Sequence, residues 1–106
     1  MNKNRISYLF LFFFIFFNFS IVKSDSIFDL GKEIFLNKAN CATCHTLVDA
    51  GSVGQIGPNL NQIRPDKIRV IAAITNGIGV MPAYQGELSI EEIDAVSHYV
   101  SISASQ

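Results

Sequence analysis

Apolar residues recur every three to four positions in three stretches of the chain, which is the period of an amphipathic helix. The first stretch, residues 26–38, has Ser26 as its expected cap and Asp29 in its first turn. The positions that share its apolar face are Ile27, Leu30, Gly31 and Ile34. A glycine inside a helix costs roughly 1 kcal/mol relative to alanine. Gly31 is therefore consistent with a second helix that approaches closely at this point.

The second stretch, residues 65–76, has a proline near its start and Gly77 directly after its end. The residues expected to face inward are Ile68, Ile71, Ala72 and Ile74. Residues 46–62 contain several glycines and a proline but no sustained period, so they predict a loop. Because no stretch alternates convincingly with the two-residue period of a strand, the pattern predicts an all-α fold.

The third helix has the most complete signals. Ser89 and Glu92 have the spacing of a capping box, and Leu88 and Ile93 stand where a hydrophobic staple would pack. The apolar stripe that follows consists of Ile93, Val96, Tyr99 and Val100. At 100° per residue His98 lies nearly opposite this stripe, so it is expected to face solvent.

The N-terminal segment differs from the rest of the chain. Positive residues precede a mainly apolar run over residues 6–17, and small residues follow it, which is the layout of a secretory signal peptide. We expect cleavage after Ser24, so that residues 1–24 are the signal peptide and residues 25–106 form one domain. The alternative is a retained membrane anchor. A spanning helix needs about 20 apolar residues, and polar residues interrupt this run.

Charge and size narrow the possible functions. Residues 25–106 contain five Lys and Arg against nine Asp and Glu, a formal charge of −4. This acidic composition argues against a nucleic-acid-binding role, because that role requires a basic face. A domain this small buries only a modest core and often depends on a metal, a disulfide or a cofactor.

The segment Cys41-Ala42-Thr43-Cys44-His45 has the spacing of a c-type haem attachment site. Each thiol can form a thioether with one vinyl group of the porphyrin, and one helical turn then brings His45 beneath the iron. Met81 is the only methionine besides the initiator and is the expected second axial ligand. A histidine and a methionine are the axial pair of electron-transfer cytochromes c.

The two cysteines have two other possible interpretations. A thioredoxin-like dithiol would need a βαβ pattern, which is not evident. A structural zinc site needs four ligands, usually cysteines and histidines at paired spacings. The chain has only two of each, and His98 is badly placed. Haem attachment is favoured over both.

The segment Gly57-Pro58-Asn59-Leu60 follows the haem motif by a dozen residues. Proline has no N–H, but its carbonyl is a free acceptor. The Pro58 carbonyl can therefore accept a hydrogen bond from Nδ1–H of His45 and orient the ring, as ligand histidines usually require. By itself, a Gly-Pro pair is more often an ordinary turn.

Together these features resemble the class I c-type cytochromes, which are small mono-haem proteins. The residues that carry the resemblance are Gly31, Phe35, residues 41–45, residues 57–60, Met81-Pro82 and Tyr99. The resemblance implies three to four helices wrapped around one covalent haem c, with the first and last helices crossing at Gly31. It also implies that Phe35 and Tyr99 pack at the crossing, and that Pro58 binds the proximal histidine.

The chain departs from the mitochondrial members of this family because it has no tryptophan to hold a haem propionate. Arg64 and Asn76 are candidates for that role. The implied function is a periplasmic electron carrier between redox proteins such as a membrane oxidoreductase, a terminal oxidase or a periplasmic dehydrogenase. No catalytic residues are expected. The alternatives are a haem subunit of a periplasmic oxidoreductase and, less well supported because of Met81, an enzyme or sensor with an open iron position.

The distribution of charge suggests how such a carrier docks. The segments expected to rim the haem edge, residues 42–43, 53–56 and 81–86, contain no charged residue. Exposed apolar residues, namely Val53, Ile56, Pro82 and Tyr84, would then form the docking patch, although Val53 and Ile56 could equally pack on the porphyrin. The acidic residues lie on the first helix and around the start of the last one.

Overall fold

Four α-helices, two short strands and their connections make up residues 25–106, the part of the chain that the computed structural model describes. The predicted signal peptide lies outside these residues. The helices are α2 (Ser26–Glu33), α3 (Leu60–Ile63), α4 (Lys67–Asn76) and α5 (Ile90–Ser103). A π-helical segment, η2 (Ile34–Lys38), continues α2, and two 3-10 turns follow, η3 (Cys41–Thr43) and η4 (Val48–Ala50). The predicted all-α class is confirmed.

The stretch predicted as a loop contains a minimal antiparallel sheet. Strand β1 (Thr46–Leu47) pairs with β2 (Ser52–Val53), with Thr46 opposite Val53. Each strand has two residues, which is too short for an alternating pattern to be recognised in the sequence. Helix α3 also begins in this stretch. The predicted loop is therefore partly structured.

The helix caps follow local hydrogen bonding. Asp25, rather than Ser26, caps α2, because its carboxylate accepts the backbone N–H of Phe28 at 3.1 Å. Asp66 caps α4 in the same way, so this helix begins at Lys67 and not at Pro65 as predicted. The predicted capping box of α5 is confirmed by reciprocal bonds of 3.0 and 3.1 Å between Ser89 and Glu92.

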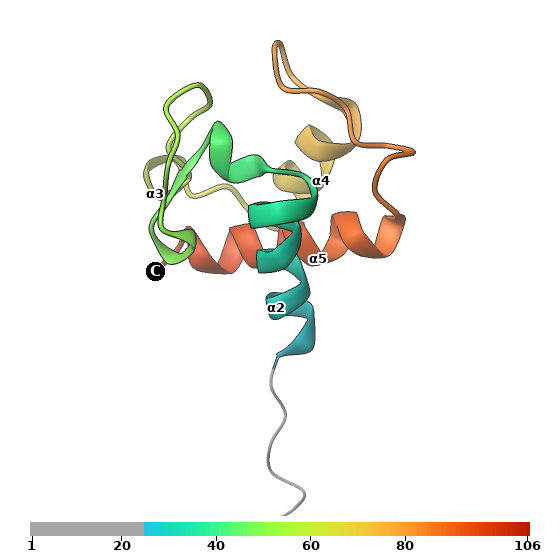
Figure 1. Ribbon diagram of the computed structural model, residues 1–106, viewed down its shortest axis with the longest axis horizontal. Helices are drawn as coiled ribbons and strands as arrows, with labels where there is room; N and C mark the ends of the chain where they lie inside the picture. The colour runs from blue at the N-terminus through green and yellow to red at the C-terminus, as the bar shows by residue number, and fades with distance from the viewer. Residues whose placement is uncertain (1–24) are drawn as a thin grey trace, which may run out of the picture.

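Helix α2 crosses α5 at Gly31 (Figure 1). A Cβ atom on Gly31 would lie 2.1 Å from the Ala95 carbonyl oxygen and 2.6 Å from the Tyr99 Cβ atom. The two backbones therefore touch where a side chain would hold them apart. The Tyr99 ring packs edge-on against Phe28 and Phe35, with ring centroids 4.9 and 5.7 Å apart. The predicted crossing and its aromatic packing are confirmed.

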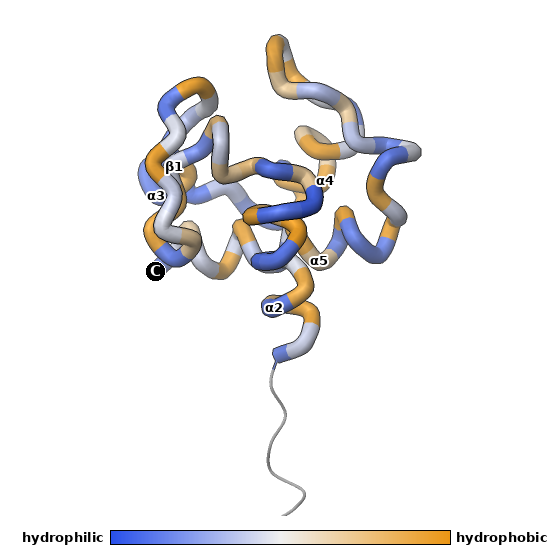
Figure 2. Tube along the Cα trace, viewed as in Figure 1, coloured by the Kyte–Doolittle hydropathy of each residue, from blue (hydrophilic) through white to orange (hydrophobic). Residues whose placement is uncertain are grey.

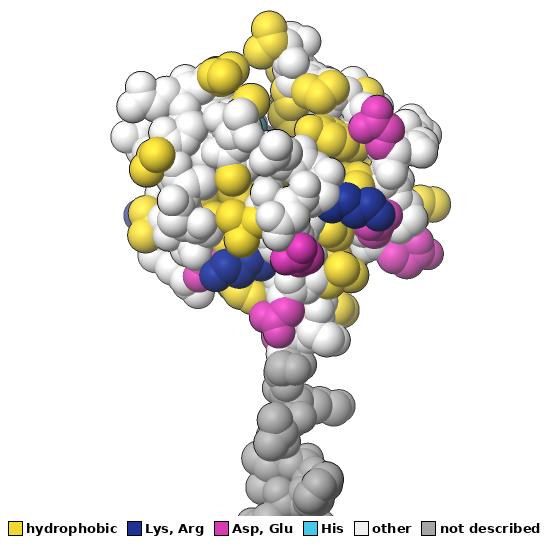
Figure 3. Space-filling model, in the orientation of Figure 1, with side chains coloured by type: hydrophobic (Ala, Val, Ile, Leu, Met, Phe, Trp, Pro, Cys, Tyr) yellow, Lys and Arg dark blue, Asp and Glu magenta, His cyan; other side chains and the backbone are white. Residues whose placement is uncertain are grey.

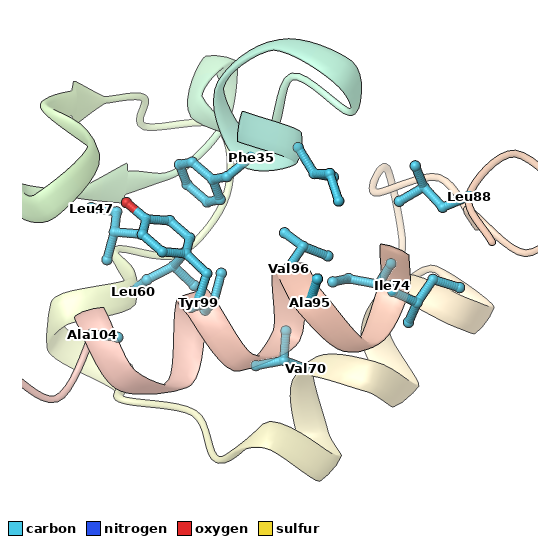
Figure 4. Packing of buried hydrophobic residues seen from close by; sticks show 13 residues of the cluster. Phe35, Leu47, Leu60, Val70, Ile74, Leu88, Ala95, Val96, Tyr99 and Ala104 are labelled. Carbon is cyan, nitrogen blue, oxygen red and sulfur yellow. The ribbon is translucent and has the colours of Figure 1, made fainter. Parts of the chain in front are cut away.

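The core gathers around this crossing, with Phe35 and Tyr99 wholly buried (Figure 4). The Tyr99 hydroxyl donates to the Asp49 carboxylate at 2.7 Å, and Lys32 pairs with the same carboxylate at 3.3 Å. Burial, together with the neighbouring Asp49, raises the pKa of Tyr99, so the phenol stays a hydrogen-bond donor. This bond attaches η4 to the helix crossing.

The inward faces differ from those predicted for two helices. On α2 and its continuation η2, Gly31 and Ile34 are buried as expected, whereas Ile27 and Leu30 are about half exposed. On α4, Ile74 is buried as expected, but Ile68 is 80% exposed and Ala72 is also exposed. The second buried residue of α4 is Val70, one turn before Ile74. Apolar side chains therefore remain on the outside of both helices.

Apolar residues also occupy the tips of two loops that extend away from α5 (Figure 2). In the space-filling view, hydrophobic side chains gather over the upper part of the visible face, and most acidic ones lie lower or at its right edge (Figure 3). Within residues 25–106, none of the helices combines the length and the hydropathy needed to cross a membrane.

Candidate haem-binding site

A cavity of about 640 Å³ lies between α4, α5 and the loops, and its walls are mainly apolar. Its size falls in the range of binding pockets for small molecules and cofactors, roughly 300–1,000 Å³. Five residues predicted for the site line this cavity, namely Cys41, Cys44, His45, Pro58 and Met81. The fold thus gathers in one place residues that are up to 40 positions apart in the chain.

The 3-10 turn η3 places the first three of these residues. Asn40 precedes the turn with a φ of 58°, in the left-handed region that asparagine tolerates better than most residues. The backbone N–H groups of Cys44 and His45 then both donate to the Cys41 carbonyl, at 3.1 and 3.0 Å. One tight turn therefore turns both thiols and the imidazole towards the cavity.

The His45 ring is oriented by a backbone carbonyl. Its Nδ1 atom lies 2.8 Å from the Pro58 oxygen. Because a carbonyl oxygen can only accept, Nδ1 must carry the proton of this hydrogen bond. In a neutral imidazole the lone pair is then on Nε2, which is the state that a metal-ligating histidine requires. The predicted contact between Pro58 and His45 is present in the structure.

Two glycines, Gly54 and Gly57, pack against this motif, and their packing was not predicted. A Cβ atom on Gly57 would lie 2.5 Å from the Cε1 atom of the His45 ring. A Cβ atom on Gly54 would lie 2.6 Å from the Thr43 carbonyl oxygen. The backbone N–H of Gly57 also donates to the Cys44 carbonyl at 2.7 Å. The segment from Gly54 to Pro58 thus lies directly against the cysteine-histidine turn.

The segment that carries Met81 is held at several points. Ile78 and Met81 exchange two backbone hydrogen bonds, of 3.1 and 2.9 Å, in a tight hairpin. Gly77, with a φ of 73°, leaves room for the Met81 carbonyl, which would lie 2.7 Å from a Cβ at that position. Beyond Met81, the Tyr84 hydroxyl donates to the Ala39 carbonyl at 3.1 Å. Tyr84 therefore links the Met81 segment to the chain just before Cys41.

Cys41 and Cys44 are partly buried and form no disulfide with each other. Burial raises the pKa of the Cys41 thiol to about 11. The thiolate is the form that attacks disulfides, so Cys41 in this environment is a poor nucleophile near neutral pH. The buried environment of Cys41 therefore disfavours the dithiol-exchange alternative.

Three other candidate residues lie outside the cavity wall. His98 does not simply face solvent as predicted, because its Nε2 atom lies 3.1 Å from the Asp25 carboxylate and its side chain is only 27% exposed. Arg64 donates to the Asn61 carbonyl at 3.3 Å, and Asn76 is exposed at the end of α4. Neither Arg64 nor Asn76 lines the cavity. Arg69, which was not predicted, does.

The cavity fits a covalently attached porphyrin. Its apolar walls match a flat hydrophobic macrocycle, and its two thiols stand one turn apart, as thioether attachment requires. The imidazole and thioether groups in the wall are both iron ligands of c-type haem proteins.

Comparison with known proteins agrees with this geometry. The family described as cytochrome C oxidase, cbb3-type, subunit III matches residues 28–100. Cytochrome c6 of Microcystis aeruginosa is 35% identical over 74 residues, covering 66% of this chain and 89% of that protein. Cytochrome c6 of Leptolyngbya boryana is 37% identical over 78 residues, covering 66% and 85%.

The crystal structure of the c-type cytochrome SorU from Sinorhizobium meliloti has the same fold, with a TM-score of 0.73 and 50% sequence identity. The similarity covers 78% of this chain and 97% of SorU. Fold, cavity and relatives together define an electron-transfer haem protein. The chain belongs to the class I c-type cytochromes, and its cofactor is haem c.

Proposed function

We propose that this protein is a periplasmic mono-haem electron carrier rather than an enzyme, with His45 and Met81 as the axial ligands of the iron. Cys41 and Cys44 form the two thioether bonds. The observation that carries the proposal is that all four side chains line one cavity, with His45 already oriented by the Pro58 carbonyl. When bound, the haem supplies a single reversible one-electron couple.

The protein's own residues determine how that couple behaves. Pro58 holds the proton on Nδ1 of His45 and so keeps Nε2 available for the metal. The hairpin at Ile78–Met81 and the Tyr84 hydroxyl bond fix the backbone on either side of the Met81 thioether. A thioether opposite a histidine raises the reduction potential. We therefore expect a relatively high potential.

Replacement of Met81 tests the ligation. Met81→Ala should abolish the weak far-red charge-transfer band that a thioether gives with ferric iron, and it should lower the midpoint potential. Both quantities are measured on the purified holoprotein, by optical spectroscopy and redox titration. His98→Ala is the matched control and should change neither, because His98 lies against Asp25 and outside the cavity. An unchanged band and potential in Met81→Ala would falsify the axial assignment.

The alternative is a haem subunit that works only within a periplasmic oxidoreductase. The matching family description, which names a subunit of a larger oxidase, favours this alternative. Isolation of the protein from its native periplasm separates the two. A free carrier elutes alone, whereas a subunit elutes in a fixed ratio with its catalytic partner.

The rim of the cavity supports apolar docking to redox partners. Ile56, Ile78 and Val80 line the cavity and are also 67–88% exposed. Pro82 lines it and is exposed as well, whereas Tyr84 is partly buried, and Val53 lies outside the cavity wall. No Asp or Glu among the described residues lines the cavity.

We therefore expect the docking rate to depend weakly on salt. Charge-steered association is accelerated 10- to 1,000-fold at low ionic strength, in order of magnitude. For this protein, stopped-flow electron transfer to its native partner should slow by less than about tenfold between low and high salt. A steeper decline of the rate with salt would mean that the acidic residues of α2 and α5 lie in the interface with the partner.

A further inference from the structure

The cavity wall contains one permanently charged side chain, the guanidinium of Arg69 on α4. The other polar side chains in the wall belong to Asn40, His45, Tyr84 and the two cysteines. Among the described lining residues there is no lysine, aspartate or glutamate. Arg69 is exposed, so it stands where the cavity opens to solvent and can meet an anionic group of a molecule bound in the cavity.

The other cationic side chains of residues 25–106 already have partners. The three lysines pair with carboxylates, in the pairs Lys32–Asp49, Lys38–Glu92 and Lys67–Asp94. The Arg64 side chain donates to a backbone carbonyl. The Asp66 carboxylate near Arg69 accepts from the Arg69 backbone N–H and forms no ion pair with its guanidinium. Arg69 thus has no ion-pair partner among the described residues.

We propose that the Arg69 guanidinium binds a propionate of the haem, taking the role for which Arg64 and Asn76 are unsuited by position. The inference rests on the proposed placement of the haem in this cavity. The porphyrin of haem c carries two carboxylates on one edge, and the domain has a formal charge of −4. These carboxylates therefore add negative charge to an already acidic protein, and a nearby cation offsets it.

An arginine is suited to this role. Its planar guanidinium group can donate two parallel hydrogen bonds to a carboxylate, and such charge-assisted bonds are stronger than neutral ones. Arg69 lies one helical turn from Ala73, which also lines the cavity, so the α4 backbone anchors the side chain along the wall. Arg69 is a cofactor-binding residue in this proposal and takes no part in ligating the iron.

The pH dependence of the midpoint potential tests the role of Arg69. In the wild type, Arg69 keeps the propionate ionised, so the potential should be nearly constant between pH 5 and 8. In Arg69→Gln the propionate loses its cation and titrates in this range. Because reduction removes one positive charge from the iron, the propionate binds its proton more tightly in the reduced protein. The potential of Arg69→Gln should therefore fall as the pH rises.

Other titratable groups at the cavity do not give this signal. The pKa of Tyr84 is raised by burial above its usual value near 10, and thioethers do not titrate. The carboxylate of Asp66 remains in both proteins. His45 is bonded to the Pro58 carbonyl in both as well. A pH dependence that appears only in Arg69→Gln therefore reports on the propionate.

Arg69→Gln should also lower the potential itself, since a lost cation favours ferric iron. We expect a shift of about tenfold in the reduction equilibrium, which is about 59 mV for one electron. Arg69→Lys keeps the charge and should restore most of the potential and the flat pH profile. Arg64→Gln is the matched control and should resemble the wild type.

The outcomes are decisive in both directions. A flat profile and an unchanged potential in Arg69→Gln would overturn the proposal, as would an equal effect of Arg64→Gln. Equal effects of Arg69→Lys and Arg69→Gln would indicate a packing role and would also overturn it. The far-red band should persist in every variant. Its loss in the wild type would instead contradict the proposed ligation by Met81.

Discussion

Replacement of both cysteines, Cys41→Ala with Cys44→Ala, should give a protein without cooperative thermal unfolding. The two thioethers are the covalent attachment of the cofactor in the proposed function. Without the cofactor, the cavity of about 640 Å³ opens inside a domain of 82 described residues. Its apolar walls would then face water, and a domain this small has little other core to hold it together.

Loss of this packing is expected to be decisive, because the whole stability of a small domain is only about 5–15 kcal/mol. Partial collapse of the walls reduces their exposure to water but removes the native packing. Circular dichroism and calorimetry of the double variant provide the measurement. Thr43→Ala, in the same turn but exposed and outside the cavity wall, is the control and should melt like the wild type. A sharp melting transition in the double variant would mean that the fold does not depend on haem.

The second large effect is expected at the helix crossing. In Gly31→Val the new Cβ atom would overlap the Ala95 carbonyl oxygen, which lies only 2.1 Å from that position. The partner is backbone in the middle of α5, so it yields only if the two helices move apart. Overpacking of a core costs about 1–3 kcal/mol and occasionally more. We expect a loss at the top of this range.

For a domain of this size, about 3 kcal/mol lowers the melting temperature by roughly 12 °C or more. The measurement is thermal unfolding of the holoprotein. Gly79→Asn is the control, because nothing lies within 4 Å of a Cβ at Gly79 and asparagine tolerates its φ of 56°. A melting temperature of Gly31→Val equal to that of Gly79→Asn would show that the helices do not need to touch at residue 31.

Features set by neighbours in the sequence were predictable. The capping box at Ser89 and Glu92 is one example, since both of its bonds join residues three apart. The cap of α2 was misplaced by one position, because Asp25 and Ser26 are both good caps and the sequence does not distinguish them. The inward face of α4 was misassigned for a related reason. Residues 68 and 70–74 are all apolar, so no single stripe stands out.

Features set by distant parts of the chain were only partly predictable. The contact between Pro58 and His45 was anticipated because both belong to recognisable motifs. The role of Gly57 was not, because it depends on how closely the loop approaches the imidazole ring. Arg69 was missed for the same reason. Its place in the cavity wall depends on the rotation of α4, which is set by packing against α5 rather than by the local pattern.

The mainly apolar lining of the cavity also bears on how fast this protein can exchange electrons. When the iron changes its charge by one unit, nearby dipoles and water must reorient, and that reorientation is part of the activation barrier. Side chains such as Phe35, Ile74, Val96 and Val100 have few dipoles to turn. The polar groups that are present, such as His45 and Tyr84, are held by hydrogen bonds of 2.8 and 3.1 Å. A pocket with few dipoles, and with its polar groups already held by hydrogen bonds, undergoes little rearrangement during electron transfer. It therefore supports rapid transfer even when the driving force between donor and acceptor is small.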